Sequence, residues 1–129
     1  MVFITGGAAQ GKRSFAENVL GVRAFTAGSG CTPEDVLTAE CVTGYHELIA
    51  RLMNEGIDPV NFTERFCREN PSAVVIMNEV GSGIVPMESC EREWREMVGR
   101  CGCIIAERSE TVIRMVCGIA GVIKGEYRW

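Results

Sequence analysis

The residues best suited to chemistry form one loop, Gly6-Gly7-Ala8-Ala9-Gln10-Gly11-Lys12, which follows the apolar run Met1–Ile4. Glycine, four residues, glycine and lysine is the pattern of a phosphate-binding loop between a strand and a helix. The glycines let the backbone curl so that several N–H groups face one anion. Lys12 adds a mobile positive charge that can reach terminal phosphates. The loop therefore predicts a site for a phosphorylated ligand.

The position after the lysine departs from this pattern. A Ser or Thr at that position usually holds Mg²⁺, whereas this chain has Arg13 followed by Ser14. One residue turns a helix by about 100°, so Ser14 does not simply replace the missing hydroxyl. We expect Arg13 and Ser14 to contact the bound phosphates, and a strand-to-helix turn without a ligand is the alternative.

Composition and charge indicate one globular domain over residues 1–129. Apolar residues make up 47% of the chain and charged residues 23%, which is an ordinary balance without a signature of disorder. The net charge of −4 argues against a nucleic-acid partner, since proteins that bind the phosphate backbone are usually basic. A small anionic ligand stays compatible, because main-chain amides and one lysine suffice to hold it.

No apolar run is long enough to predict a membrane span, and Met1 leads directly into an apolar strand rather than a leader peptide. The cytoplasm is therefore the expected location. Seven cysteines are many for this length, and their odd number favours reduced thiols over a disulfide framework. Cys101 and Cys103 form the one close pair, and no second pair completes a zinc site.

Hydrophobic patterning predicts strands alternating with helices, which is typical of a mostly parallel α/β sandwich. We expect strands at 1–5, 24–27, 73–77 and 110–119, and helices at 12–21, 42–55, 59–69 and 87–100. Residues 32–35 fit a helix start or a turn, and residues 36–41 fit either a strand or a helix. The run 73–77 is apolar on both faces, so we expect it at the centre of the sheet.

Ligands gather at the carboxyl ends of parallel strands, so residues at those ends are candidates for the site. Thr26, Ala27 and Gly28 end the second strand and are expected to contact the nucleotide. Glu40 and Glu79 each close an expected strand, where they could hold Mg²⁺ or accept a proton from a substrate hydroxyl. A structural alternative for Glu79 is that it caps the turn at Val80-Gly81.

Several stretches resemble the bifunctional adenosylcobinamide kinase / adenosylcobinamide-phosphate guanylyltransferase family of cobalamin biosynthesis. The similar stretches are the loop 6–12, Glu40-Cys41-Val42-Thr43, the distinctive run from Met77 to Pro86, Trp94-Arg95-Glu96 with Gly99-Arg100, and residues 118–124. The resemblance implies a P-loop NTPase-like three-layer sandwich, often assembled as a homo-oligomeric trimer. It implies transfer of phosphate from ATP or GTP to a cobinamide hydroxyl. From their places in the loop and at the strand end, we expect Lys12 and Glu79 to be the catalytic residues of such a transfer.

The family's second step transfers GMP through a guanylated histidine, and here the chain departs from the resemblance. Residues 28–39, where that histidine is expected, contain none. The one histidine, His46, follows Cys41, and its neighbours at helical spacing predict a surface residue. Gly102-Cys103 stands where the family shows Asn-Gln. We therefore expect the kinase step without guanylyl transfer. A nucleotide-binding module without turnover, or a small kinase for another substrate, are the alternatives.

Overall fold

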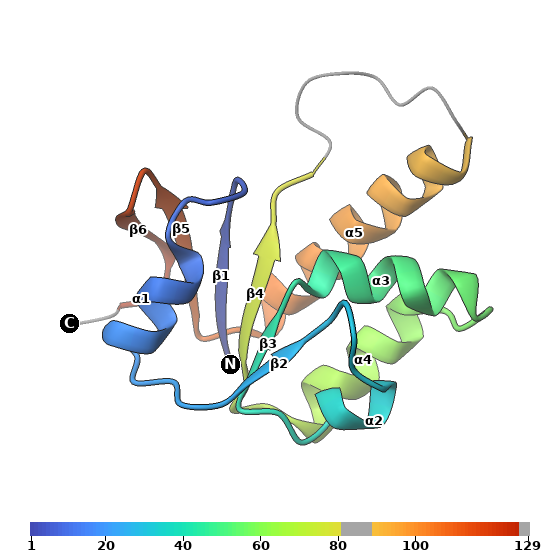
Figure 1. Ribbon diagram of the computed structural model, residues 1–129, viewed down its shortest axis with the longest axis horizontal. Coiled ribbons are helices and arrows are strands. Elements are labelled where there is room, and N and C mark those ends of the chain that lie inside the picture. Colours follow the sequence, from blue (N-terminus) through green and yellow to red (C-terminus); the bar gives the residue numbers. More distant parts are fainter. Residues whose placement is uncertain (81–88, 127–129) are drawn as a thin grey trace.

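The computed structural model describes residues 1–80 and 89–126 and shows helices on both faces of one sheet (Figure 1). The strands are β1 Val2–Gly6, β2 Phe25–Ala27, β3 Cys41–Thr43, β4 Val74–Asn78, β5 Thr111–Val116 and β6 Ile119–Lys124. The helices are α1 Lys12–Asn18, α2 Pro33–Val36, α3 Tyr45–Asn54, α4 Pro59–Glu69 and α5 Ser89–Arg108.

The six strands lie in the order β2-β3-β4-β1-β5-β6. The first five are parallel to one another, and β6 runs antiparallel to β5. β1 pairs with β4 on one side and with β5 on the other. The end of β1, which leads into the loop 6–12, therefore lies in the interior of the sheet beside the end of β4.

Alternate side chains of the central strands point to opposite faces of the sheet, as the strand period requires. Ile4 and Ile76 pack with Phe15 and Ala16 of α1 on one face. Phe3 and Val75 belong to the core formed with α3, α4 and α5 on the other face. Figure 1 shows the same division, with α1 on one side of the sheet and α3, α4 and α5 on the other. The predicted three-layer α/β sandwich with a mostly parallel sheet is confirmed.

Several element boundaries differ from the sequence expectation. The helix expected at 42–55 begins only at Tyr45, because Cys41–Thr43 forms β3 and Gly44 turns the chain with a φ of 60°. α5 continues to Arg108 rather than ending at residue 100, because Cys101 and Ile105 are buried against the core. The expected start of this helix at 87–88 and residues 81–86 of the distinctive run from Met77 to Pro86 lie outside the described residues.

Within residues 1–80 and 89–126, no helix has the length and apolar character needed to cross a membrane. The buried cysteines are Cys31, Cys41, Cys67 and Cys101, and the cysteines of these ranges form no disulfide. Burial raises the pKa of the Cys41 thiol to about 12. Buried thiols of this kind act as small apolar side chains in the core.

Candidate nucleotide-binding site

The loop 6–12 is shaped by two glycines that lie against the β5–β6 hairpin. Gly6 has a φ of 148°, and a Cβ placed on it would lie 2.5 Å from the carbonyl oxygen of Met115. Gly11 has a φ of 92° and lies against Gly118. Side chains are excluded at Gly6 by β5 itself, so glycine is the residue that lets β1 turn into the loop at this point.

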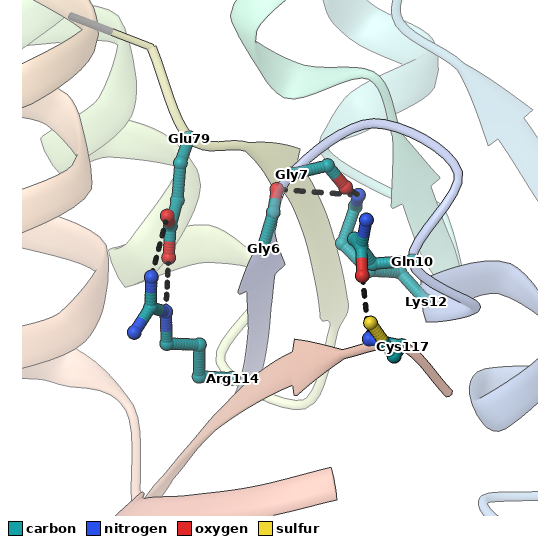
Figure 2. A network of polar contacts seen from close by, with 7 residues as sticks. All are labelled: Gly6, Gly7, Gln10, Lys12, Glu79, Arg114 and Cys117. Carbon is teal, nitrogen blue, oxygen red and sulfur yellow. Dashed lines mark hydrogen bonds and ion pairs between the residues drawn. The ribbon is translucent and has the colours of Figure 1, made fainter. Parts of the chain in front are cut away.

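Lys12 is folded back onto its own loop, and its side chain is buried, with 6% of the residue exposed. Its Nζ donates hydrogen bonds to the carbonyl oxygens of Gly6 at 3.3 Å and Gly7 at 2.5 Å (Figure 2). Burial lowers the pKa of the Lys12 ammonium, and the nearby Glu79 carboxylate partly offsets that shift. The ammonium thus lies inside the curled loop, where an anion would meet it.

Gln10 fastens the tip of the loop to the β5–β6 hairpin. Its side-chain oxygen accepts a hydrogen bond from the Cys117 amide at 2.5 Å (Figure 2). Its main-chain carbonyl accepts a hydrogen bond from the Gly118 amide at 3.1 Å. Cys117 and Gly118 form the turn with φ values of 49° and 79°. The hairpin therefore holds the loop in its curled conformation, and β6 belongs to the support of the site.

A cavity of about 420 Å³ opens beside the loop. It lies beside the ends of the neighbouring strands β1 and β4, whose following helices α1 and α5 pack on opposite faces of the sheet, and this is the usual place for a ligand in this fold class. The described residues that line it are Ala9, Gln10, Gly11, Lys12, Arg13, Ser14, Ser29, Thr43, Gly44, His46, Glu47, Ile76 and Asn78.

Most of the predicted loop residues reach this cavity. Residues 9–14 line it, including Arg13 and Ser14, whereas Gly6, Gly7 and Ala8 are not among the described lining residues. The Arg13 guanidinium lies 4.4 Å from the centroid of the Phe25 ring, which holds it as a cation–π contact. Lys12 and Arg13 together place two positive charges at the cavity.

Thr26, Ala27 and Gly28 are not among the described lining residues, although β2 ends at the expected edge. β3 and β4 separate β2 from β1, so Ser29, the next residue but one after β2, reaches the cavity instead. The Gly28 amide donates to Thr43 at 2.7 Å, and a Cβ on Gly28 would lie 2.5 Å from the Gly44 carbonyl oxygen. Gly28 supports the wall of the cavity from behind.

The expectation that Glu40 closes a strand at the ligand edge is wrong. Glu40 precedes β3, and its carboxylate accepts hydrogen bonds from the amides of Arg23 and Ala24 at 2.9 and 3.3 Å. Its main-chain carbonyl accepts a hydrogen bond from the amide of Val74, the first residue of β4. The length of β4 therefore separates Glu40 from Glu79 by roughly 16 Å. The period of residues 36–41 did not reveal this, because the stretch is irregular: α2 ends at Val36, a turn follows at 37–38, and β3 begins only at Cys41.

Glu79 lies at the expected edge, directly after β4, and its amide bonds to the Gly6 carbonyl at 2.9 Å. Its two carboxylate oxygens bind Nε and Nη2 of Arg114 at 2.7 and 3.1 Å (Figure 2). This pair raises the pKa of the Arg114 guanidinium. Glu79 lines a second cavity of about 200 Å³ on the α5 face rather than the cavity beside the loop.

The prediction of a surface histidine at position 46 is also wrong. His46 is buried, with 8% of the residue exposed, and it lines the larger cavity. Its Nδ1 accepts a hydrogen bond from the Asn78 amide at 3.2 Å. Helical spacing alone gave the wrong result, because Thr43 lies in β3 rather than in the helix, and because Asn78 and Trp94 contact His46 from other elements.

The carboxylates predicted to hold Mg²⁺ do not fit that role in this arrangement. Glu40 lies at the amino end of β3 and Glu79 at the carboxyl end of β4, so the two residues are at opposite ends of the parallel strands. Both oxygens of Glu79 are bound by Arg114. Arg13 stands where the loop pattern has a hydroxyl. In residues 1–80 and 89–126, no three His, Cys, Asp or Glu side chains are grouped to hold a metal ion.

Comparison with known proteins agrees with the sequence resemblance. No curated protein matches the chain. The family model described as cobinamide kinase / cobinamide phosphate guanyltransferase matches residues 26–123, from β2 through β6. The match begins after the loop 6–12, so a phosphate-binding role for that loop rests on its own sequence pattern and geometry. Because the match covers well over half of the chain, the protein belongs to the cobinamide kinase / cobinamide phosphate guanyltransferase family.

Proposed function

We propose that this chain binds ATP or GTP in the cavity beside the loop 6–12 and transfers the terminal phosphoryl group to a cobinamide hydroxyl. The observation that carries the proposal is the buried Lys12 ammonium inside a curled loop at the mouth of a cavity. Family membership supplies the nucleotide-dependent transferase chemistry and cobalamin biosynthesis as its setting. In this proposal, residues 1–129 act as a single nucleotide-binding domain.

The side chains of the cavity suit phosphoryl transfer, in which positioning and charge neutralisation lower the barrier. On binding, the Lys12 ammonium exchanges the Gly6 and Gly7 carbonyls for phosphate oxygens, which are stronger acceptors. Arg13 and Ser14 lie on the same wall. Glu79 acts through Lys12, since its negative charge favours the protonated ammonium.

Guanylyl transfer is not part of the proposal. The segment 28–39 carries no histidine, and Nδ1 of His46 already accepts a hydrogen bond from the Asn78 amide. Incubation with labelled GTP should leave no covalent GMP on the protein.

A second candidate function is a nucleotide-binding module without turnover. It is favoured by Arg13, which stands where the loop pattern has Ser or Thr, and by the two hydrogen bonds that Arg114 donates to Glu79. Assembly as a homo-oligomeric trimer also stays a proposal, and the exposed Ile119 and Ile123 of β6 support it.

The deciding experiment follows phosphate rather than binding alone. The protein is incubated with γ-labelled ATP or GTP and cobinamide, with and without Mg²⁺, and the cobinamide is isolated and analysed by mass spectrometry. Phosphorylated cobinamide supports the kinase. Binding of nucleotide without any transfer supports the module instead, and the absence of both rejects the site.

Glu79 should set the upper pH limit of nucleotide binding. Lys12 binds phosphate only when protonated, so binding is lost as pH rises through its pKa. Burial already lowers that pKa and Glu79 raises it, so Glu79→Gln should move the alkaline loss of affinity to lower pH. Titrations of nucleotide at several pH values measure the shift. Glu64→Gln on α4 is the matched control, and an unshifted curve for Glu79→Gln would contradict the coupling.

A further inference from the structure

The cavity beside the loop has two chemically different walls. The loop and the start of α1 supply Lys12 and Arg13, which are positively charged. The opposite wall comes from the junction of β3 and α3 and includes His46 and Glu47. Among the described residues that line the cavity, Glu47 is the one with a carboxylate. A carboxylate repels phosphate, so this wall suits the acceptor better than the nucleotide.

His46 is held with a defined arrangement of its ring nitrogens. Nδ1 accepts a hydrogen bond from the Asn78 amide at 3.2 Å, so the proton of the neutral ring is on Nε2. Nε2 lies 3.6 Å from Oε1 of Glu47. The main-chain carbonyl of His46 accepts the Trp94 indole N–H at 2.9 Å, which ties this turn to α5. The histidine therefore presents an N–H group toward the Glu47 carboxylate.

Burial favours the neutral form of His46, because it lowers the pKa of the imidazole. The Glu47 carboxylate partly offsets this shift, and Lys12 across the cavity adds a smaller lowering. A neutral ring donates from Nε2 without adding a full positive charge that would neutralise the carboxylate. Glu47 itself stays accessible, with 53% of its side chain exposed. An acidic residue in a first helical turn often serves the helix dipole alone, but this one also faces a ligand-sized cavity and an oriented histidine.

We propose that Glu47 accepts the proton of the acceptor hydroxyl during phosphoryl transfer and that His46 is a positioning residue for its carboxylate. The inference rests on the proposed function. The hydroxyl proton moves to a Glu47 oxygen while the hydroxyl oxygen bonds to the terminal phosphorus. The bond from that phosphorus to the bridging oxygen breaks, and the nucleoside diphosphate leaves with the electron pair. The acceptor class is an alcohol, seated against the β3–α3 wall opposite Lys12.

Glu79, the proton acceptor expected from the sequence, fits this role less well. Both of its oxygens are bound by Arg114, and it lines the smaller cavity on the α5 face. A proton acceptor must come within hydrogen-bond reach of the hydroxyl that it serves. Glu47 lies on the same cavity as the phosphate-binding loop, which satisfies that requirement.

The test separates proton acceptance from binding. Glu47→Gln should reduce kcat for cobinamide phosphorylation about 100-fold, the low end for general base catalysis. The Kd for nucleotide should stay within about twofold of wild type. Glu55→Gln at the exposed end of α3 is the matched control and should keep the wild-type kcat. A Glu47→Gln enzyme with wild-type kcat overturns the inference, as does one whose only defect is weaker nucleotide binding.

Two variants of His46 test the positioning role, because one keeps only the acceptor at the Nδ1 position and the other restores a donor near the Nε2 position. His46→Asn keeps an acceptor near the Asn78 amide but loses the Nε2 donor, so kcat should fall while KM for nucleotide is unchanged. His46→Gln places an amide N–H near the Nε2 position and should recover part of the loss. Equal kcat in both variants and wild type overturns the positioning role. A wild-type protein that transfers no phosphate overturns the proposed function itself, and the inference with it.

Discussion

Replacing Lys12 with methionine should weaken binding of ATP or GTP about 10- to 150-fold, because hydrogen bonds to a charged group contribute about 1.5–3 kcal/mol. Methionine has a similar length and fits the buried position without a charge to desolvate. The fold should therefore persist, and only the partner of the phosphates is lost. Isothermal titration with a non-hydrolysable triphosphate measures the change.

Lys124→Met is the matched control for Lys12→Met, since it removes the same charge from the chain. Lys124 donates to the carbonyls of Ala106 and Glu107 at the end of α5, away from the cavity. The affinity of the Lys124→Met variant for nucleotide should match that of the wild-type protein. Equal affinity in Lys12→Met and wild type would mean that the ammonium serves only to close the loop, and the phosphate site would be wrong.

Replacing Gly6 with alanine should destabilise the protein by about 2–4 kcal/mol. The φ of 148° costs a residue with a Cβ about 1–3 kcal/mol. The added methyl would also lie 2.5 Å from the Met115 carbonyl, so β1 and β5 must move apart. Chemical denaturation measures the free energy of unfolding, and nucleotide binding should fall with the displaced loop.

Gly7→Ala is the neighbouring control for Gly6→Ala. Its Cβ would meet Gln10 Cγ at 3.5 Å, an ordinary contact, and its backbone is not left-handed. The change in unfolding free energy should be below about 1 kcal/mol. If Gly6→Ala were as mild as Gly7→Ala, the close approach of β5 to the loop would not be what fixes its shape.

The sequence predicted the turn at the loop 6–12 between β1 and α1 because the pattern is local. Glycines, a lysine and a buried strand within 12 residues define this turn, and phosphate binding there stays a prediction. The central strand at 73–77 was equally clear, since an apolar run on both faces requires an interior position. These features depend little on how distant parts of the chain pack.

The second wall of the cavity could not be predicted with the same means. Glu40 was expected at the wrong end of β3, because a three-residue strand leaves no period to read. His46 was expected at the surface, because its burial comes from Asn78 and Trp94, which lie 32 and 48 residues away in the chain. A glycine directly after Thr43 was the one local signal, since a left-handed residue there delays the helix to Tyr45.

The pairing of Glu79 with Arg114 shows the same limit. Glu79 stood at the expected strand end, but its partner comes from β5, 35 residues further along. Only the register of β1 between β4 and β5 brings the two side chains together. Strand order decides such contacts, and neither composition nor hydrophobic pattern determines strand order.

The most direct measurement is a crystal structure of the protein with a non-hydrolysable analogue of ATP or GTP. The account predicts a triphosphate along the amides of residues 7–12, with Lys12 Nζ moved from the Gly6 and Gly7 carbonyls to the phosphate oxygens. Two results would contradict the account. In one, the nucleotide binds elsewhere and Lys12 stays on those carbonyls; in the other, no nucleotide is bound even at saturating concentration.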